Sequence, residues 1–326
     1  MNAIAVAIAA SVLSFAMGFA IRRGTVCVVV AAQDLVVRRR PDKFIGFATA
    51  ACWSGLLLVP LAWSAPAVFH LSPGYDQLIQ ALLFGCLYGI GAWANQACGF
   101  GTLAHLTGGR LGYLLTLAGW VIGASFISKV YRPQQIPEPS LLATSPLAAI
   151  AAWLAFAAVC WWSWPRLRLL RRRSRWRKML LGRARMRPFE AMLIIGIGGG
   201  LLYACAGSWT YLGLLSSYGS QLVMRDFTPS SPLPALLGTA MMIGGGLFAA
   251  VRSASFRLRG TNWRQGSRHL AGGTVMGLAT QLIPGGNGVI IVYGLPSFAP
   301  HALTAYFGMT LTLTLIFAAT NYSRRA

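Results

Sequence analysis

The chain has 326 residues, of which 56% are hydrophobic and only 10% are charged. Soluble domains carry about 25% charged residues, so this composition excludes an ordinary soluble domain. The formal net charge of +22 arises from 28 Lys and Arg residues against only six acidic residues, too few to supply much general acid–base chemistry.

Nine apolar stretches approach or reach the length of about 20 residues that a helix needs to cross a bilayer. In chain order they are 2–21, 44–65, 77–93, 111–130, 144–164, 189–206, 232–251, 269–283 and 298–319. The first lacks a basic leading region, so we interpret it as a retained helix and not as a signal peptide. The stretch at 269–283 needs flanking residues to cross. We therefore expect an all-α polytopic membrane protein with about nine transmembrane helices.

Basic residues cluster in short segments beside the apolar stretches, which is typical of cytoplasmic loops and favours contact with anionic lipid headgroups over nucleic acid. Eleven of them fall within 165–188, and others lie at 38–43, at 252–268 and at the C-terminal end. If all these segments are cytoplasmic, the nine crossings place the N-terminus outside and the C-terminus in the cytoplasm.

This count requires that three glycine-rich stretches enter and leave by the same face as re-entrant short helices: 22–36, 95–109 and 284–297. A fourth stretch, 206–219, lies where a matching hairpin is expected. The order then predicts an inverted internal repeat, with a first repeat at 1–143, a linking helix and basic loop at 144–188, and a second repeat at 189–326. In transporters such broken elements indicate the binding site.

The cysteines support the same location. Four of the six lie inside apolar stretches, where a free Cys is usually a small hydrophobe: Cys52, Cys86, Cys160 and Cys205. Cys27 and Cys98 lie in the glycine-rich interruptions. No pair has CxxC spacing and no His/Cys cluster has zinc spacing, so we expect no metal, no cofactor and no enzymatic activity.

Two interpretations remain open for the neighbouring residues. The glycines of the interruptions serve either tight helix packing or close approach of backbone N–H groups to an anion. Arg22 and Arg23 either neutralise an anion at the inner mouth of a path or anchor a helix end at the cytoplasmic surface.

Three segments, GFAIRRGTVCVVVAAQDL (18–35), ANQACGFGTLAHLTGGRLGYLLTLAGWVIGA (94–124) and GGTVMGLATQLIPGGNGVIIVYGLPSFAPHALT (272–304), resemble the YeeE/YedE membrane proteins. The resemblance implies nine crossings with re-entrant helices, a bacterial cytoplasmic (inner) membrane and uptake of thiosulfate or a related sulfur compound from the periplasm, where the N-terminus would lie. It also implies a path lined by three cysteines. Cys27 and Cys98 match the first two, whereas this chain has Gly286 and Asn287 at the third and so lacks that thiol.

The sequence therefore predicts transport of a small sulfur-containing anion into the cytoplasm through a path lined by Cys and Gly. The residues assigned to this path are Cys27, Cys98, Gly24, Gly99, Gly101, Thr102, Gly285, Gly286 and Asn287, with Arg22 and Arg23 as charges at the inner mouth. A cytoplasmic sulfur-carrier or rhodanese-like protein is the expected partner. The alternative is a membrane subunit that docks such a sulfurtransferase or carrier without transport of its own.

Overall fold

The computed structural model describes residues 3–130, 137–167, 182, 185–207, 209–224, 233–283 and 286–322. Gly285 and most of the basic loop 165–188 lie outside these residues. Within them the chain is all-α, without named strands, as expected from the sequence. The elements are α1 (Ala3–Gly24), α2 (Val28–Val37), α3 (Asp42–Ser64), α4 (Leu78–Asn95), α5 (Gly99–Leu106), α6 (Tyr113–Val130), α7 (Leu141–Thr144), α8 (Pro146–Ser163), η1 (Trp164–Arg166), α11 (Pro188–Ala206), α12 (Tyr211–Met224), α13 (Leu233–Arg252), α14 (Trp263–Leu282), α15 (Gly286–Val289), the π-helix η2 (Ile290–Gly294) and α16 (Pro300–Tyr322).

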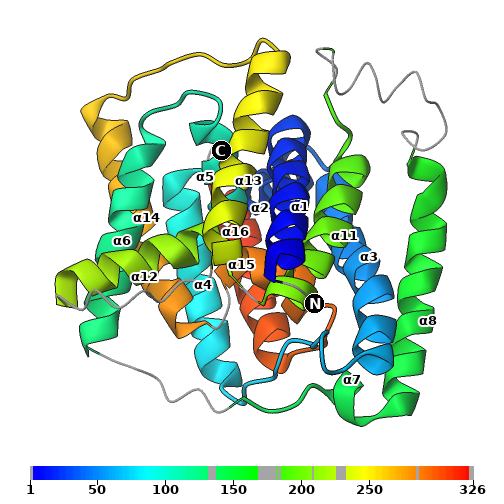
Figure 1. The fold of residues 1–326 in the computed structure, drawn as a ribbon. Helices are drawn as coiled ribbons and strands as arrows, with labels where there is room; N and C mark the ends of the chain where they lie inside the picture. The colour runs from blue at the N-terminus through cyan, green and yellow to red at the C-terminus, as the bar shows by residue number, and fades with distance from the viewer. Residues whose placement is uncertain are drawn as a thin grey trace.

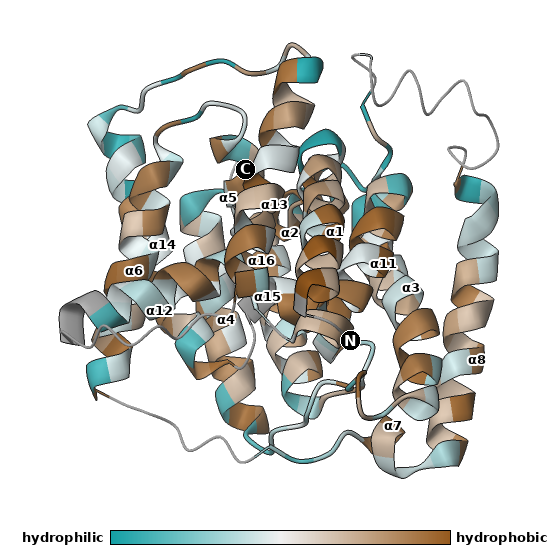
Figure 2. Ribbon diagram, in the orientation of Figure 1, coloured by the Kyte–Doolittle hydropathy of each residue, from teal (hydrophilic) through white to brown (hydrophobic). Residues whose placement is uncertain are grey.

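The helices are long and apolar enough for a multi-pass membrane protein. Eight candidate spans occur within the described residues, three of which join a long helix to the short helix that follows it. Figure 2 shows hydrophobic residues along the helices and hydrophilic ones concentrated at their ends and in the loops. The predicted stretch 269–283 is part of α14, which begins at Trp263 and whose first two turns include Arg264 and Arg268. Because of these polar turns α14 is not among the eight spans.

The long helices pack in close pairs. In Figure 1, α1 lies against α13, α3 against α11, α4 against α16, and α6 against α14; α1 also contacts α11, and α4 also contacts α14. Glycines permit this close approach, since a Cβ at Gly85 would overlap the Ala305 carbonyl oxygen and one at Gly89 would lie 2.9 Å from that of Met309. Gly85 and Gly89 of α4 therefore serve packing against α16.

Two faces of the molecule differ in charge. One, which we call the basic face, includes the loops 107–112 and 253–262, joined by the hydrogen bonds Leu111 N–H to Arg259 O (3.0 Å) and Arg257 N–H to Gly108 O (3.1 Å). At the other, the opposite face, loop 65–77 pairs with Glu138 through Gly74 N–H to Glu138 O (2.7 Å). Figure 1 shows the basic face at the top.

The first two predicted interruptions each contain a short break followed by a short helix. Residues 22–24 form the last turn of α1, and only Thr25, Val26 and Cys27 separate α1 from α2. Likewise only Gln96, Ala97 and Cys98 separate α4 from α5. The stretch 206–219 contains most of α12, which packs on α6 and lies across the other helices in Figure 1.

Candidate functional site

The breaks after α1 and α4 have the same local structure. Each helix ends with a non-glycine residue in the left-handed region, Thr25 (φ 49°) and Gln96 (φ 62°). The next N–H then bonds back five residues, from Val26 to Ile21 O (3.2 Å) and from Ala97 to Ala92 O (3.1 Å). This is the Schellman arrangement of a helix C-terminus. A positive φ costs a β-branched residue such as Thr25 conformational energy, and such strain is concentrated at functional sites.

A cysteine follows each of these turns and occupies the N-cap position of the next helix. Cys27 precedes α2 and Cys98 precedes α5, both with extended backbone. The two sulfurs lie 3.5 Å apart, and the Cys98 N–H donates to Cys27 Sγ at 3.4 Å. Cys27 is 4% exposed and Cys98 is 0% exposed. The structure thus brings together the two thiols that the sequence singled out.

Two helix N-termini meet at this cysteine pair. The first N–H groups of α2 (10 residues) and α5 (eight residues) have no partner within their own helix. The positive ends of the helix dipoles favour an anion at such a point. Gly101 faces the pair from the first turn of α5, where a Cβ would lie 2.7 Å from Cys27 Sγ.

The buried amide of Asn95, at the end of α4, fixes the second break. Its Nδ2 donates to Ala97 O (2.8 Å) and to Thr102 Oγ1 (3.2 Å). Its Oδ1 accepts from Thr116 Oγ1 (2.6 Å) and lies 2.9 Å from His269 Nδ1. Since Asn95 Oδ1 is the acceptor, His269 carries a proton on Nδ1. This one side chain therefore ties the break to α5, α6 and α14.

Two tyrosines hold the start of α5. Tyr88 Oη accepts from the Gly99 N–H (3.2 Å), and Tyr211 donates to Gly99 O (2.6 Å). Tyr88 belongs to α4, about two turns before Asn95, so the chain turns back along α4 before α5 begins. The first turn of α5 is thereby positioned by side chains from α4 and α12.

A cavity of about 490 Å³ opens beside the cysteine pair, and we call it the vestibule. Its walls include Val29, two residues after Cys27, and Gln96, two residues before Cys98. Its polar lining further includes Gln33, His105, Arg110, Tyr113 and Arg268. Neither Arg110 nor Arg268 forms an ion pair within the described part of the chain. The vestibule is therefore a cationic space on the basic face.

The aromatic wall of the vestibule is built by stacking. The Tyr113 ring lies 4.6 Å from the His105 ring and 4.2 Å from the His269 ring. Because His269 is also bonded to Asn95, this wall is connected to the break that carries Cys98. In the described ranges no three His, Cys, Asp or Glu side chains cluster as metal ligands would.

The other predicted site residues lie around this centre. Thr102 is buried and bonded to Asn95, as described above. A Cβ at Gly24 would overlap the Ala191 side chain, so Gly24 permits contact between α1 and α11. Arg22 donates to Ala104 O (3.1 Å) and to Ser255 Oγ (2.9 Å), and Arg23 donates to Gly182 O (2.7 Å). Both arginines bind loops of the basic face, and neither is among the vestibule residues.

The third interruption lies on the other side of the cysteine pair. Gly286 is the first residue of α15, in which Asn287 also lies, while Gly285 falls outside the described residues. A Cβ at Gly288 would lie 3.3 Å from the Phe100 ring of α5. Tyr293 of η2 donates to His70 O (2.9 Å) in the loop of the opposite face. This segment therefore connects α5 to the opposite face.

Four residues of the site were not predicted from the sequence: Tyr88, Asn95, Arg110 and Arg268. Asn95 had a signal, since a polar amide ends an otherwise apolar stretch. Arg268 appeared only as the last residue of the basic segment 252–268, and Arg110 is a single basic residue after the glycine-rich stretch 95–109. Nothing local distinguishes either from a lipid anchor. Their position in one cavity depends on the packing of α5, α6 and α14.

Comparison with known families places the chain in a functional context. A family model described as sulphur transport matches residues 23–315. No curated protein matches the chain. The matched region includes both cysteine-bearing breaks, the third interruption and both arginines of the vestibule. The chain belongs to the sulphur transport family of membrane proteins, the YeeE/YedE family.

Proposed function

We propose that this protein carries a small sulfur-containing anion, such as thiosulfate, into the cytoplasm past Cys27 and Cys98. The observation that carries the proposal is the meeting of two thiols, 3.5 Å apart, where α2 and α5 begin beside the cationic vestibule. Thiols are weak, polarisable donors, and helix N-termini favour negative charge. Together they can replace part of the hydration shell of an anion without holding it tightly.

The proposed direction follows from the charges of the loops. Lys and Arg are enriched in cytoplasmic loops of membrane proteins, so the basic face is assigned to the cytoplasm and the opposite face to the periplasm. The anion would then meet α15 and η2 first, pass the cysteine pair, and leave through the vestibule between Arg110 and Arg268. The N-terminus is assigned to the periplasm and the C-terminus to the cytoplasm of a bacterial inner membrane.

The helix contacts support the proposed inverted repeat. In this repeat the counterparts of α1, α3, α4 and α6 are α11, α13, α14 and α16. The contact between α1 and α13 then corresponds to the contact between α11 and α3. The contact between α4 and α16 corresponds to the contact between α14 and α6. All four pairs are in contact. The short elements agree, since α2 packs on α16 as α12 packs on α6. The proposed topology has nine crossings, which are the eight apolar spans and α14.

The proposed mechanism is channel-like. A membrane potential that is negative inside opposes anion uptake by about 2.3 kcal/mol per charge per 100 mV. The breaks carry no acidic residue that could couple uptake to protons. Consumption of the anion in the cytoplasm, by a sulfur-carrier or rhodanese-like partner, would maintain the inward gradient.

The test uses a bacterial host without sulfate uptake, grown on thiosulfate as the only sulfur source. Loss of one donor to a charged group costs about 1.5–3 kcal/mol, which corresponds to a loss of about tenfold or more. We therefore expect Cys27→Ala and Cys98→Ala to lower the initial rate of labelled thiosulfate uptake by about tenfold at equal protein levels. Cys52→Ala in α3 is the matched control and should transport normally.

Uptake by the purified protein in liposomes separates transport from docking. A transport protein admits thiosulfate without any partner, whereas a docking subunit does not. Wild-type rates of uptake in both Cys27→Ala and Cys98→Ala would rule out the thiol-lined path.

A further inference from the structure

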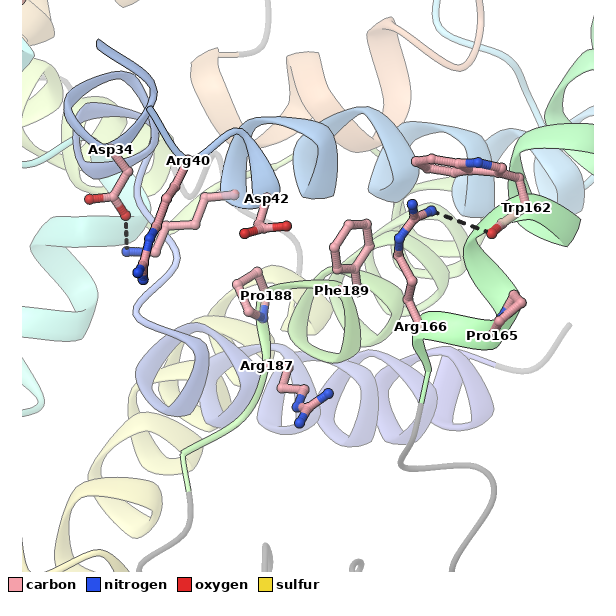
Figure 3. Close-up of a pocket in the computed structure, with 10 residues that line it drawn as sticks. Asp34, Arg40, Asp42, Trp162, Pro165, Arg166, Arg187, Pro188 and Phe189 are labelled. Carbon is pink, nitrogen blue, oxygen red and sulfur yellow. Dashed lines mark hydrogen bonds and ion pairs between the residues drawn. The ribbon is translucent and has the colours of Figure 1, made fainter. Parts of the chain in front are cut away.

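A second cavity, of about 700 Å³, opens on the basic face and shares no lining residue with the vestibule. It lies between the end of α2, the start of α3, η1 after α8, and the start of α11 (Figure 3). Its charged residues are Asp34, Arg40, Asp42, Lys43, Arg166 and Arg187, and its apolar wall includes Trp162, Pro165, Pro188 and Phe189. We call it the lateral cavity.

The negative charges of the two carboxylates in the lateral cavity, Asp34 and Asp42, are already balanced by nearby positive groups. Asp34 binds Lys43 Nζ at 2.9 Å and Arg38 Nη1 at 3.0 Å. Asp42 lies in the first turn of α3, where the helix dipole stabilises an acidic side chain. Arg40, Arg166 and Arg187 form no ion pair with any described residue. Within the described part of the chain, the cavity thus presents three arginines that have no acidic partner.

Arg166 is held ready for a planar, negatively charged ligand. Its guanidinium lies 3.6 Å above the Trp162 ring and 5.6 Å from the Phe189 ring. Figure 3 shows this arginine between the two aromatic side chains, and Arg187 also lines the cavity, at the start of α11. Its Nη1 donates to Trp162 O at 3.5 Å, which together with stacking limits the motion of the side chain. Its remaining N–H groups can bind phosphate oxygens.

The position of α8 sets the level of the lateral cavity in the membrane. α8 packs against α3 at the edge of the molecule, and its outer surface exposes Leu147, Ile150 and Leu154. Its last turn and η1 expose Trp161, Trp162 and Trp164. Tryptophans gather where hydrocarbon meets headgroups. The mouth of the cavity therefore lies at the level of lipid phosphates, beside a helix that faces lipid.

We propose that the lateral cavity binds the phosphate of an anionic phospholipid from the leaflet at the basic face. The lipid phosphate bridges Arg166, which follows α8, to Arg187, which precedes α11, and so ties the peripheral α8 to the helix bundle. Phospholipid binding at this site does not depend on which anion the protein transports. The binding experiment therefore tests the site separately from the proposed function.

The experiment measures phospholipid binding to the purified full-length protein by native mass spectrometry and by thermal unfolding in detergent. Dioleoylphosphatidylglycerol is compared with dioleoylphosphatidylcholine for the wild type and for R166Q/R187Q. R257Q/R259Q, on the exposed loop between α13 and α14, removes the same number of charges from the same face. Diffuse attraction to anionic lipid falls equally in both variants.

We expect phosphatidylglycerol, and not phosphatidylcholine, to stay bound and to raise the melting temperature of the wild type and of R257Q/R259Q. Binding to R166Q/R187Q should be about tenfold weaker than to R257Q/R259Q. If R166Q/R187Q does not fold, R187Q and the conservative R166K are each compared with R257Q.

Three outcomes would overturn the proposal. The first is equal phosphatidylglycerol binding by R166Q/R187Q and R257Q/R259Q, or by the single variants and R257Q where these are used. The second is equal stabilisation of the wild type by phosphatidylcholine. The third is the same stabilisation by millimolar inorganic phosphate, which would assign the cavity to a free anion.

Discussion

At Gly101 the absence of a side chain permits the contact between α5 and Cys27. A Cβ at this position would lie 2.7 Å from Cys27 Sγ and 3.0 Å from the Ala97 side chain. Real Cβ atoms do not approach other heavy atoms this closely, so any larger residue must displace the thiol or shift α5. The lack of a side chain at Gly101 therefore leaves room for the Cys27 thiol beside Cys98.

Gly101→Ala should lower thiosulfate uptake at least as strongly as loss of the Cys27 thiol, because the added methyl group displaces the sulfur. The matched control is Gly244→Ala in α13, where an added Cβ meets nothing within 4 Å. Replacing Gly by Ala in a helix stabilises it by about 0.5–1 kcal/mol. The control should thus transport normally and unfold at the same or a higher temperature. Normal uptake by Gly101→Ala would show that the thiol position is unimportant.

Other residues of the site act by holding the chain in place. Asn95 satisfies four polar partners, three of them from α5, α6 and α14 and one in the break itself. Removal of a buried partner costs about 1–3 kcal/mol for each group left unpaired. Thr25 and Gln96 accept a positive φ so that each helix can end just before a cysteine. This unfavourable backbone conformation is retained where the position of the turn must be fixed.

At the level of elements, α2 and α5 are too short to be stable alone, since isolated helices below about 12–15 residues are marginal in water. α2 packs against α3 and α16, and α5 packs against α1, α6 and α13. Each short helix thus depends on the long helices around it. Their N-termini meet because those long helices hold both short helices at fixed positions.

The meeting of α2 and α5 can be tested by cross-linking their N-caps. Diamide accepts one hydrogen from each thiol and becomes a hydrazine, leaving a disulfide between Cys27 and Cys98. A disulfide requires sulfurs about 2.05 Å apart, so the present separation of 3.5 Å needs only a small shift. We expect the cross-link in peptide mass spectra and a loss of uptake that dithiothreitol reverses.

Cys98→Ala provides the control for this experiment, because its residual uptake should not respond to diamide. If the wild type forms no such disulfide and keeps both thiols open to alkylation after unfolding, the two N-caps do not lie side by side in the membrane.

At the largest scale, six arginines of the described residues form three pairs with different surroundings. Arg22 and Arg23 bind loop carbonyl groups and join α1 to the basic face. Arg166 and Arg187 line the lateral cavity, and Arg110 and Arg268 line the vestibule. A positively charged cavity raises the local concentration of anions, and salt screens this effect.

R110Q/R268Q should therefore raise the KM for thiosulfate by about tenfold and weaken the dependence of uptake on ionic strength. The charge-matched control is R257Q/R259Q, whose side chains are exposed on the basic face outside both cavities. Uptake by reconstituted protein over a range of salt concentrations provides both quantities. Equal effects of the two double variants would mean that only the overall charge of the face matters.

The sequence predicted the helical membrane architecture, the positions of the breaks and the two cysteines within them. Hydropathy, glycine content and charge are local properties, and they locate spans and interruptions well. The predicted interruption 22–36 began three residues too early, because the pattern of Gly24 and Thr25 does not reveal that α1 continues through Gly24. The start of α14 was placed too late, because its first turns carry polar side chains that face the vestibule and the loops of the basic face.

The class of the molecule follows from its composition, since 56% hydrophobic residues in long uncharged runs can satisfy their backbone in lipid only as helices. The folded chain was needed to show that Cys27 and Cys98, separated by 71 positions, lie in contact, and that Arg110 and Arg268 share one cavity. These contacts depend on which helices pack together. That choice rests on many weak, close contacts between distant segments, which no local pattern of residues contains.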